Sequence, residues 1–517
     1  MRKVFLLPHA RFNMHFWLML DEAVVAHQAG DEVGVVYCDG CLKYCRTNIC
    51  ASKIVCRICH ALAKTAIKSL PQEIKTYPLG QFVTAPNRSE VEKLRFNYHS
   101  IDELKAIEYR GVDIGYSVLS FYVDLRRNLY PDFNEVTVAF FDQLLRVAAH
   151  LTHAVEVIDD VIKPDHYAVF NGRLFDARPF FRKPCLMGRR VQCFEAESLP
   201  PTWEFRSVHY NNSLPHDVIA NSDMTISLWK EAAKTLPEER MIEIGESFFE
   251  GRRGKMPFSP TIKSFVLEQV ENKLPEGWDA QKRNFVFFNS SEDEFAGIDK
   301  DYDSFKYKPT QQAVIESVAR LAADADPNIH IYLRIHPNLK HVKHRYHSDL
   351  LQLGSQFSNL TVVPADSPVS TYSLLEVAEK IITVGSTVGV EAVYFKKPSI
   401  LLGPSSYRFL DVCYVPKNDD ELRAMLKDSL EKKSAFPAIQ FGFLWASDKG
   451  RQWSCFDFGS TGRTRFLGLR IPVSPVFKLF GSMRLFGLMY KLFVEQILFL
   501  PFQLKRSAFR RIGISSS

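Results

Sequence analysis

Three short polar stretches of this 517-residue chain follow predicted buried strands and could hold a phosphorylated ligand. The clearest is VGSTVGVEA at residues 384–392, where a strand ends at Gly385, the hydroxyls of Ser386 and Thr387 follow, and a helix is predicted to begin. Backbone N–H groups, hydroxyls and the positive end of a helix would then converge on one point, which suits a phosphate or diphosphate. Glu391, in the first turns of that helix, could reach a ribose hydroxyl. The alternative is an ordinary strand-to-helix turn with Ser386 as its N-cap.

The other two stretches are LRIHP (333–337) and FFNSSEDE (287–294). His336 is predicted where a strand leaves the sheet at its carboxyl end, the edge at which open α/β sheets bind ligands. A histidine there can donate a hydrogen bond to a phosphate or act as an acid toward a leaving group. Ser290 and Ser291 offer hydroxyl groups to the same ligand, although FFNSSEDE could equally be a polar turn that caps the next helix.

The elements that must position these residues alternate between strand and helix along the whole chain. Short buried runs read as strands and longer runs with apolar residues at helical spacing read as helices, which favours parallel sheets covered by helices on both faces. A segment rich in Gly, Pro and charge near 251–281 interrupts the alternation, which then restarts. The sequence therefore predicts an α/β fold with two Rossmann-like domains, over residues 1–265 and 275–450, followed by a basic amphipathic tail over 451–517. The predicted strands are 3–7, 31–38, 166–170, 190–197, 284–288, 328–337, 360–364, 381–385 and 397–403, and the predicted helices are 15–30, 133–162, 309–325, 373–380, 388–395 and 419–433.

The order FFNSSEDEF, RIHP and SPVSTYSLLEVAEKIITVGSTVGVEAVYFKKPSILLG resembles the C-terminal domain of GT-B glycosyltransferases. More narrowly, it looks like the capsule and surface-polysaccharide biosynthesis proteins, with some likeness to bacterial Kdo- and sialyltransferase-type enzymes. The resemblance is best over about 285–405. It implies two domains facing across a cleft, with His336 and Pro337 as the HP motif and Ser386 and Thr387 as the hydroxyl turn that holds the phosphate of a nucleotide sugar.

In such an arrangement the acceptor binds the N-terminal domain, which should supply the catalytic base. The candidates are His9, Asp39, Asp124 and Glu195, each with a structural alternative such as a turn cap, an arginine pair or a surface charge. Asn171 and Arg173 of NGR, like the glutamate of CFEAE, resemble N-domain features of related surface-carbohydrate proteins and are assigned to the acceptor side. No DxD pair is placed to bridge a metal and a nucleotide, and the GT-B enzymes that the chain resembles usually do without one, so the resemblance implies a transfer that needs no metal or other cofactor.

Six cysteines fall within CDGCLKYCRTNICASKIVCRICH, residues 38–60, a stretch predicted to be a loop on the acceptor side. Two CxxC pairs separated by 14 residues come close to the spacing of a four-thiolate zinc site. Resemblance to surface-carbohydrate proteins suggests another quartet of Cys38, Cys45, Cys56 and Cys59. The cluster is therefore interpreted as a structural zinc site or as a chance group of reduced cysteines.

The charge of the chain is concentrated at its end. Residues 463–517 hold ten Lys/Arg and one Asp/Glu, whereas the other residues hold 55 and 58, a net charge of −3. A nearly neutral body argues against a nucleic-acid binder. The basic, aromatic stretch at 484–511 contains Lys491 and Glu495 and ends in Pro501 and basic residues, which favours an amphipathic helix in a membrane interface over a spanning one. A last helix that packs on the protein's own core is the alternative.

The apolar run at the start of the chain ends at Pro8, too early for a signal peptide, so a cytoplasmic protein at the inner face of the membrane is expected. The predicted function is a glycosyltransferase that moves a sugar from a nucleotide-sugar donor to a growing, lipid-linked surface polysaccharide. The residues also allow a nucleotide-sugar epimerase of the same architecture, or a metal-binding scaffold of polysaccharide assembly that is not an enzyme.

Overall fold

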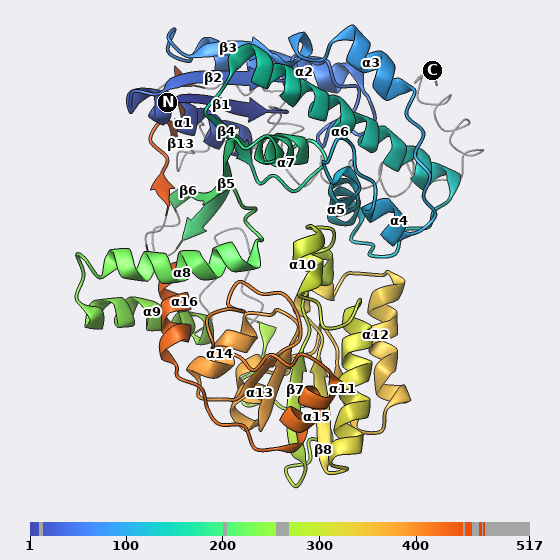
Figure 1. Cartoon of the computed structure of the whole chain (residues 1–517). Helices are drawn as coiled ribbons and strands as arrows, with labels where there is room; N and C mark the ends of the chain where they lie inside the picture. Colours follow the sequence, from blue (N-terminus) through green and yellow to red (C-terminus); the bar gives the residue numbers. More distant parts are fainter. Residues whose placement is uncertain are drawn as a thin grey trace. The chain divides into compact units, whose positions relative to one another are not determined.

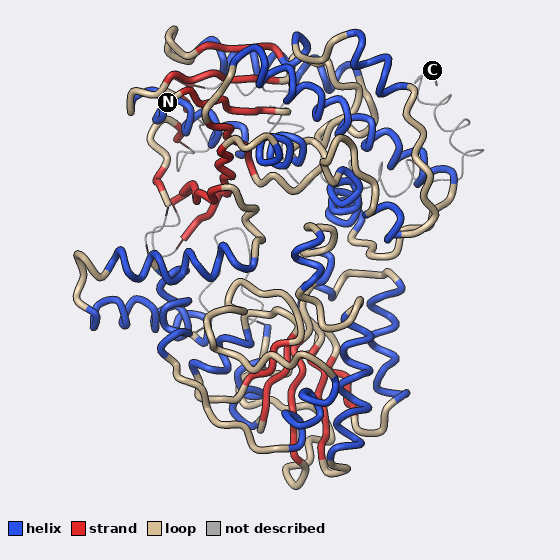
Figure 2. Tube along the Cα trace, viewed as in Figure 1, coloured by secondary structure: helices blue, strands red, loops and turns tan. Residues whose placement is uncertain are grey.

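A computed structural model describes residues 1–9, 14–199, 204–254, 268–447, 450–457, 465–467 and 469–470. The chain forms two compact units, which are drawn in Figure 1 and treated separately below. Unit 1 comprises Met1–Ala196, His209–Asn212 and Trp453–Ser517, and unit 2 comprises Glu197–Val208 and Ser213–Gln452. Figure 2 shows strands with helices around them in both units. The strand pairs at the centre of each sheet are parallel, which confirms the predicted α/β class.

A seven-stranded sheet, built mainly from unit 1, has the strand order β3-β2-β1-β4-β5, with β6 and the short β12 beyond β5. The pairs β1–β2, β1–β4, β2–β3 and β4–β5 are parallel, and Leu6 of β1 lies opposite Val36 and Val169. Because the order reverses between β1 and β4, the carboxyl ends of these two strands form the switch point at which such sheets bind ligands. The strands are β1 (Arg2–Leu7), β2 (Glu32–Tyr37), β3 (Lys75–Pro78), β4 (His166–Phe170), β5 (Arg190–Leu199), β6 (Glu204–Asn211) and β12 (Arg451–Gln452).

The longest helix of unit 1 is α6, whose N-terminus is capped by the Asn134 side chain and whose end is marked by Lys163 in a left-handed conformation. One side of α6 is apolar and buried against the rest of the unit, as expected for a helix that covers a sheet. The helices are α1 (Met14–Gln28), α2 (Lys53–Lys68), α3 (Ala85–Glu92), α4 (Ile101–Lys105), α5 (Ile114–Arg126), α6 (Glu135–Ile162) and α7 (Arg178–Leu186), with a short 3-10 helix at Leu79–Gln81.

The sheet of unit 2 repeats this order as β9-β8-β7-β10-β11, and all of its strand pairs are parallel. Its strands are nearly continuous apolar runs, as parallel strands covered on both faces require. The order reverses between β7 and β10, which is the switch point of this unit. The strands are β7 (Arg283–Phe288), β8 (Ile329–Arg334), β9 (Leu360–Val363), β10 (Lys380–Thr383) and β11 (Ser399–Leu401).

Unit 2 also contains residues 213–254, which the sequence had assigned to the N-terminal domain. Phe249 and Met241 of α9 pack into the same buried clusters as Phe441 and Phe443 of α16, and these contacts explain the difference. The helices are α8 (Val218–Ala232), α9 (Glu238–Arg253), α10 (Lys300–Ser304), α11 (Gln311–Ala325), α12 (Arg345–Gln356), α13 (Thr371–Val377), α14 (Val388–Tyr394), α15 (Asp419–Lys427) and α16 (Phe436–Ala446), with short 3-10 helices at Glu292–Glu294 and Pro337–Leu339.

Two glycines let α9 and α16 approach closely, which leads to a stability prediction. A Cβ atom at Gly442 would lie 2.2 Å from the backbone oxygen of Gly245 and 2.7 Å from the Phe249 ring. Gly442→Ala is therefore expected to lower the free energy of unfolding by about 1–3 kcal/mol, measured by chemical denaturation. Gly354→Ala in α12 is the control, because its nearest contact is a valine methyl at 3.3 Å, and it should be close to neutral. Equal effects of the two changes would contradict this packing.

Several sequence predictions need correction in detail. The helix predicted at 373–380 ends at Val377, and Lys380 is instead a buried residue of β10 that donates to the carbonyl oxygens of Leu426 and Asp428. The stretch 38–60 is not all loop, because α2 begins at Lys53. Charged or polar residues near the end of α13 and the start of α2 break the apolar periodicity from which the element boundaries were predicted.

The segment predicted as a tail over 451–517 begins as folded chain, and its residues 453–457 belong to unit 1. The backbone N–H groups of Ser454 and Cys455 donate to Asp21, and Phe466 is buried in the core against Trp17. Three short strands, β13 (Phe456–Asp457), β14 (Arg465–Phe466) and β15 (Leu469–Arg470), form a small sheet there. The predicted amphipathic helix lies outside the described residues. Within the described part of the chain, no helix has both the length and the apolar character needed to cross a bilayer.

Candidate functional site

Unit 2 brings its three predicted polar stretches together at the switch point of the sheet. Phe288, the last residue of β7, lies opposite both Thr383 at the end of β10 and Arg334 at the end of β8. The segments that follow these strands, which contain Ser290, Ser386 and His336, therefore leave the sheet side by side. The sequence predicted this convergence because each stretch follows a predicted buried strand.

A hydrogen bond between two of these segments fixes the position of His336. Its backbone N–H donates to the Asn289 side-chain oxygen at 2.7 Å. Its ring Nδ1 accepts the backbone N–H of Asn338 at 3.2 Å, so the neutral ring carries its proton on Nε2. Pro337 then begins a short 3-10 helix that His336 caps. The result is a partly buried imidazole whose orientation and tautomer are set by the backbone, in a form that can donate a hydrogen bond.

Ser290 is held by a reciprocal pair of hydrogen bonds with the side chain of Gln311 in α11. The Ser290 backbone N–H donates to Gln311 Oε1 at 2.9 Å, and Gln311 Nε2 donates to the Ser290 carbonyl at 3.2 Å. The Ser290 side chain is only 8% exposed, and its hydroxyl has no hydrogen-bond partner among the described residues. A Cβ atom on Gly385 would lie 3.7 Å from that hydroxyl. A buried hydroxyl without a partner is costly, so it marks a place where a ligand can be bound.

Ser291 has a different environment from its neighbour. Its hydroxyl donates to the buried carboxylate of Asp293 at 2.7 Å, a contact within the turn that follows β7. This contact favours the turn interpretation for Ser291 and the ligand interpretation for Ser290.

The turn after β10 requires glycine at its first position. Gly385 has φ of +137°, and a Cβ atom there would lie 2.4 Å from the Pro404 carbonyl oxygen. The backbone N–H groups of Gly385 and Ser386 donate to the Thr383 hydroxyl at 3.3 and 3.0 Å, and that of Val388 donates to the Ser386 hydroxyl at 3.4 Å. The expected cradle of backbone N–H groups is therefore used largely within the turn, and the Ser386 hydroxyl is the group that can still donate to a ligand.

Glu391 and Thr387 are engaged by an arginine that the sequence did not single out. Arg252 of α9 donates to Glu391 Oε1 at 2.9 Å and to the Thr387 hydroxyl at 3.1 Å. Tyr372 donates to the other Glu391 oxygen at 2.7 Å, and the glutamate is 1% exposed. Burial works against the charge of Arg252, but Glu391 and Tyr372 outweigh it and raise the pKa of the guanidinium. Both Glu391 oxygens are thus occupied, which argues against a contact with ribose.

Arg334 adds a buried positive charge two residues before His336. Its guanidinium donates to the carbonyl oxygens of Ile335, Pro364 and Ser367, and the residue is 3% exposed. Burial lowers the pKa of Arg334 to about 10, so it remains charged at neutral pH. It is a fixed positive charge at the end of β8, the strand that leads into the His336 segment.

In unit 1 the switch point holds a second group of titratable residues. His9 follows β1 and Asp176 lies beyond β4, and His9 Nδ1 is 3.6 Å from Asp176 Oδ2. Arg46, from the cysteine-rich stretch, contacts His9 Nε2 at 2.9 Å and lies 3.9 Å from Asp176 Oδ2. Because a guanidinium can only donate, Nε2 is the accepting nitrogen and the ring proton lies on Nδ1, facing the carboxylate.

The environment of these residues shifts their pKa values in opposite directions. Burial, then the charge of Arg46 and the nearby His15, hold the pKa of His9 well below its usual value. Burial raises the pKa of Asp176, opposed by Arg46. Histidine and aspartate with displaced pKa values at the ligand-binding edge of a sheet are typical of an acid–base site. Asp176 and Arg46 were missed, although a carboxylate shortly after NGR was a signal that could have been used.

The other three candidates for a catalytic base, Asp39, Asp124 and Glu195, have environments unlike that of His9. Asp39 Oδ1 accepts the Gly80 backbone N–H at 3.1 Å, and Asp124 is exposed on α5 rather than at the end of a strand. Glu195 accepts from the Asn171 side chain at 2.7 Å. Arg173 lies two residues beyond Asn171 and is 8% exposed. Of the four base candidates, only His9 has both a buried charged partner and a place at the switch point.

The cysteine-rich stretch at 38–60 forms a turn and the beginning of α2. Asn48 exchanges hydrogen bonds with Ser52, and the Cys45 thiol lies 3.4 Å from the Thr47 hydroxyl. Cys59 packs against the core of the unit. Over the described residues, no group of three or more His, Cys, Asp or Glu side chains is placed to hold a metal ion. Zinc binding by the quartet Cys38, Cys45, Cys56 and Cys59 stays a prediction.

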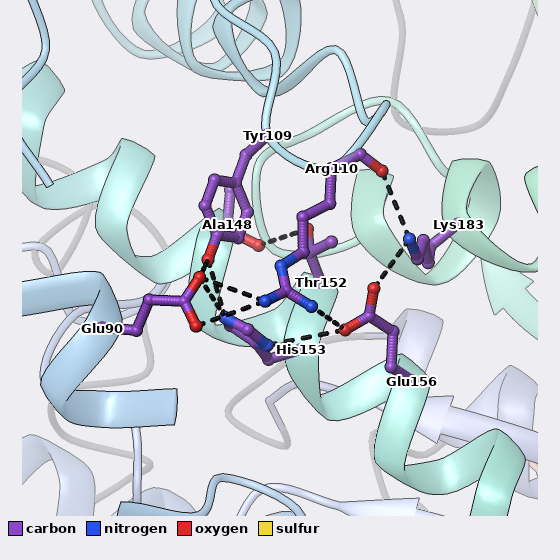
Figure 3. A network of polar contacts seen from close by, with 8 residues as sticks. All are labelled: Glu90, Tyr109, Arg110, Ala148, Thr152, His153, Glu156 and Lys183. Carbon is purple, nitrogen blue, oxygen red and sulfur yellow. Dashed lines mark hydrogen bonds and ion pairs between the residues drawn. The ribbon is translucent and has the colours of Figure 1, made fainter. Parts of the chain in front are cut away.

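A dense polar network joins α3, the turn at 109–112, α6 and α7 of unit 1 (Figure 3). Tyr109 donates to Glu90 at 2.7 Å and contacts the buried His153 at 2.6 Å. Arg110 bridges Glu90 and Glu156, and Lys183 binds Glu156 at 2.7 Å. Each charged group has a partner of opposite sign, so we interpret the network as one that stabilises the turn at 109–112.

Comparison with known proteins bears on the same residues. The family model described as capsule polysaccharide biosynthesis protein matches residues 299–427, which include His336 and the turn at 385–387. Over that quarter of the chain, the match confirms the resemblance predicted from the sequence. No curated protein matches the chain significantly.

Solved structures give weaker similarity. KpsC of Thermosulfurimonas dismutans, a beta Kdo 2,4 transferase, is 14% identical, with 54% of this chain and 78% of that chain covered and a TM-score of 0.33. UDP-GlcNAc 2-epimerase from Neisseria meningitidis, bound to UDP-GlcNAc, is 10% identical, with 86% and 98% covered and a TM-score of 0.28. The glycosyltransferase SnogD from Streptomyces nogalater is 12% identical, with 87% and 96% covered and a TM-score of 0.21. All three TM-scores lie below 0.5, so none of these structures assigns a role to a residue of this chain.

Proposed function

We propose that the chain is a glycosyltransferase that moves a sugar from a nucleotide-sugar donor to a growing surface polysaccharide. The observation that carries the proposal is the coincidence of two features. The match to capsule polysaccharide biosynthesis proteins covers His336 and the 385–387 turn, and the sheet register brings both beside the buried hydroxyl of Ser290.

The residues of unit 2 would bind the donor through its phosphates. His336 Nε2–H and the hydroxyls of Ser290 and Ser386 are neutral donors, and Arg334 supplies a fixed positive charge at the end of β8. As the bond to the sugar breaks, negative charge grows on the leaving phosphate, and oriented donors stabilise that charge without reorganisation. The proposed transfer uses these protein groups, and no metal ion, to stabilise the leaving phosphate.

The residues of unit 1 would activate the acceptor. His9 would take a proton from the acceptor hydroxyl while Asp176 stabilises the imidazolium that forms. A contact between Arg46 and Nε2 of the ring would have to open first. The acceptor proposed is a glycan carried on a lipid at the inner face of the cell membrane, where the basic tail at 463–517 would hold this cytoplasmic enzyme.

A screen of the purified full-length protein against CMP-, UDP-, GDP- and dTDP-sugars tests the proposal. Release of one nucleotide is expected, and it should rise when a lipid-linked glycan extract is added. Conversion of one nucleotide sugar into its epimer, with no effect of the extract, would favour an epimerase instead. Binding of zinc without turnover of any donor would favour a scaffold protein.

A further inference from the structure

A continuous part of unit 1 is strongly basic although most of the chain outside its tail is not. Between Asp39 and Glu73 there is no acidic residue, and six Lys/Arg occur: Lys43, Arg46, Lys53, Arg57, Lys64 and Lys68. The last four lie on α2, the sixteen-residue helix Lys53–Lys68. A net charge of +6 in this stretch contrasts with −3 for the whole chain before residue 463.

The four basic residues of α2 share one side of the helix. At 100° per residue, Lys53, Arg57, Lys64 and Lys68 fall within an arc of about 60°. All four are exposed, and none forms an ion pair with another described residue. The opposite side is occupied by Ala63 and Ala66, which are buried, and by neighbours that pack on the core of unit 1. The helix is thus anchored by one face and presents a row of cations on the other.

An exposed apolar residue adjoins this row at the start of the helix. Ile54 is 70% exposed, the highest value among the exposed large hydrophobic residues of the described chain. Cations beside an exposed aliphatic side chain suit the interface of a membrane with anionic lipids, where the charges meet headgroups and the aliphatic group enters the acyl boundary. An acidic polysaccharide would use the charges but has no use for the isoleucine.

We propose that the basic face of α2, formed by Lys53, Arg57, Lys64 and Lys68 together with Ile54, docks on an anionic lipid surface. This contact is separate from the predicted tail, because α2 lies in the folded core of unit 1. It does not depend on the proposed transferase activity.

The test compares the partitioning of the full-length protein into phosphatidylglycerol/phosphatidylcholine vesicles with that into pure phosphatidylcholine. A variant with Lys53→Gln, Arg57→Gln, Lys64→Gln and Lys68→Gln is expected to bind the anionic vesicles at least about tenfold more weakly, with a shallower dependence on salt. Ile54→Ser should weaken binding about two- to fivefold and leave the salt dependence unchanged.

Two further variants control for net charge and for folding. Lys93→Gln, Lys273→Gln, Lys300→Gln and Lys432→Gln remove the same charge from exposed sites elsewhere and should leave binding nearly unchanged. Replacing Lys53, Lys64 and Lys68 by Arg keeps the charge and should preserve binding. Equal losses in the α2 and control variants would overturn the proposal. So would an α2 variant that loses binding to dextran sulfate but not to anionic vesicles.

Discussion

Replacement of His336 by alanine is expected to lower kcat/KM for the donor by about 10²–10³-fold, the usual cost of removing one oriented donor to a developing negative charge. The structure explains why the ring acts as an oriented donor. The ring is held by the Asn338 backbone N–H, and its own backbone is tied to Asn289. The measurement is initial-rate kinetics with the donor found by screening, together with donor affinity by calorimetry.

The control for this variant is His341→Ala, which removes an exposed histidine five residues away and should leave the kinetics unchanged. Ser290→Ala gives an independent check, because it removes a buried hydroxyl that has no partner in the described part of the chain. Activity should fall while the melting temperature stays the same or rises, since an unsatisfied polar group is lost. Unchanged donor affinity and rate in both site variants would show that the nucleotide binds elsewhere.

Asp176→Asn is expected to reduce kcat by about 10²-fold or more and to leave the donor KM unchanged, because Asp176 acts through His9 on the acceptor. Asp124→Asn is the matched control, since it makes the same chemical change on the exposed face of α5. Equal kinetics in the two variants would remove the His9–Asp176 pair from the mechanism.

The pH dependence of kcat distinguishes a role in catalysis from a role in folding. A base must be unprotonated, and burial and Arg46 hold the pKa of His9 well below 6.5, so kcat should stay constant from pH 8 down to 6.5. Arg46→Met removes one of the groups that lower this pKa. The acidic limb of the profile should therefore move to higher pH. A profile that does not move would mean that His9 is not the titrating group.

The prediction from sequence was most successful where local pattern and topology agree. Apolar runs such as Asn284–Phe288 form strands because only a buried parallel strand accommodates them, and polar residues that follow them must lie at the ligand-binding edge. Ser290, His336 and the turn at Gly385 could therefore be placed together without a structure. The left-handed Gly385 also fits a turn that no other residue would adopt.

Residues brought in from distant segments could not be predicted in this way. Arg252 reaches Glu391 across 139 positions, and Arg46 reaches His9 across 37. No periodicity links such pairs, so Glu391 was assigned to ribose although its carboxylate serves an internal ion pair. The burial of Lys380 in β10 was not predicted for a similar reason, because a lysine inside a strand is expected to be exposed. Predicting these roles would have required knowledge of the tertiary contacts, which the local sequence pattern does not contain.

Transfer of a labelled sugar tests the central proposal most directly. With the donor identified by screening and a lipid-linked glycan acceptor, label should appear in the glycan, one sugar for each nucleotide released. His336→Ala should lower both signals by about 10²–10³-fold, and His341→Ala should leave both unchanged. Recovery of all the label in a nucleotide sugar of changed configuration, with none in the glycan, would contradict a glycosyltransferase.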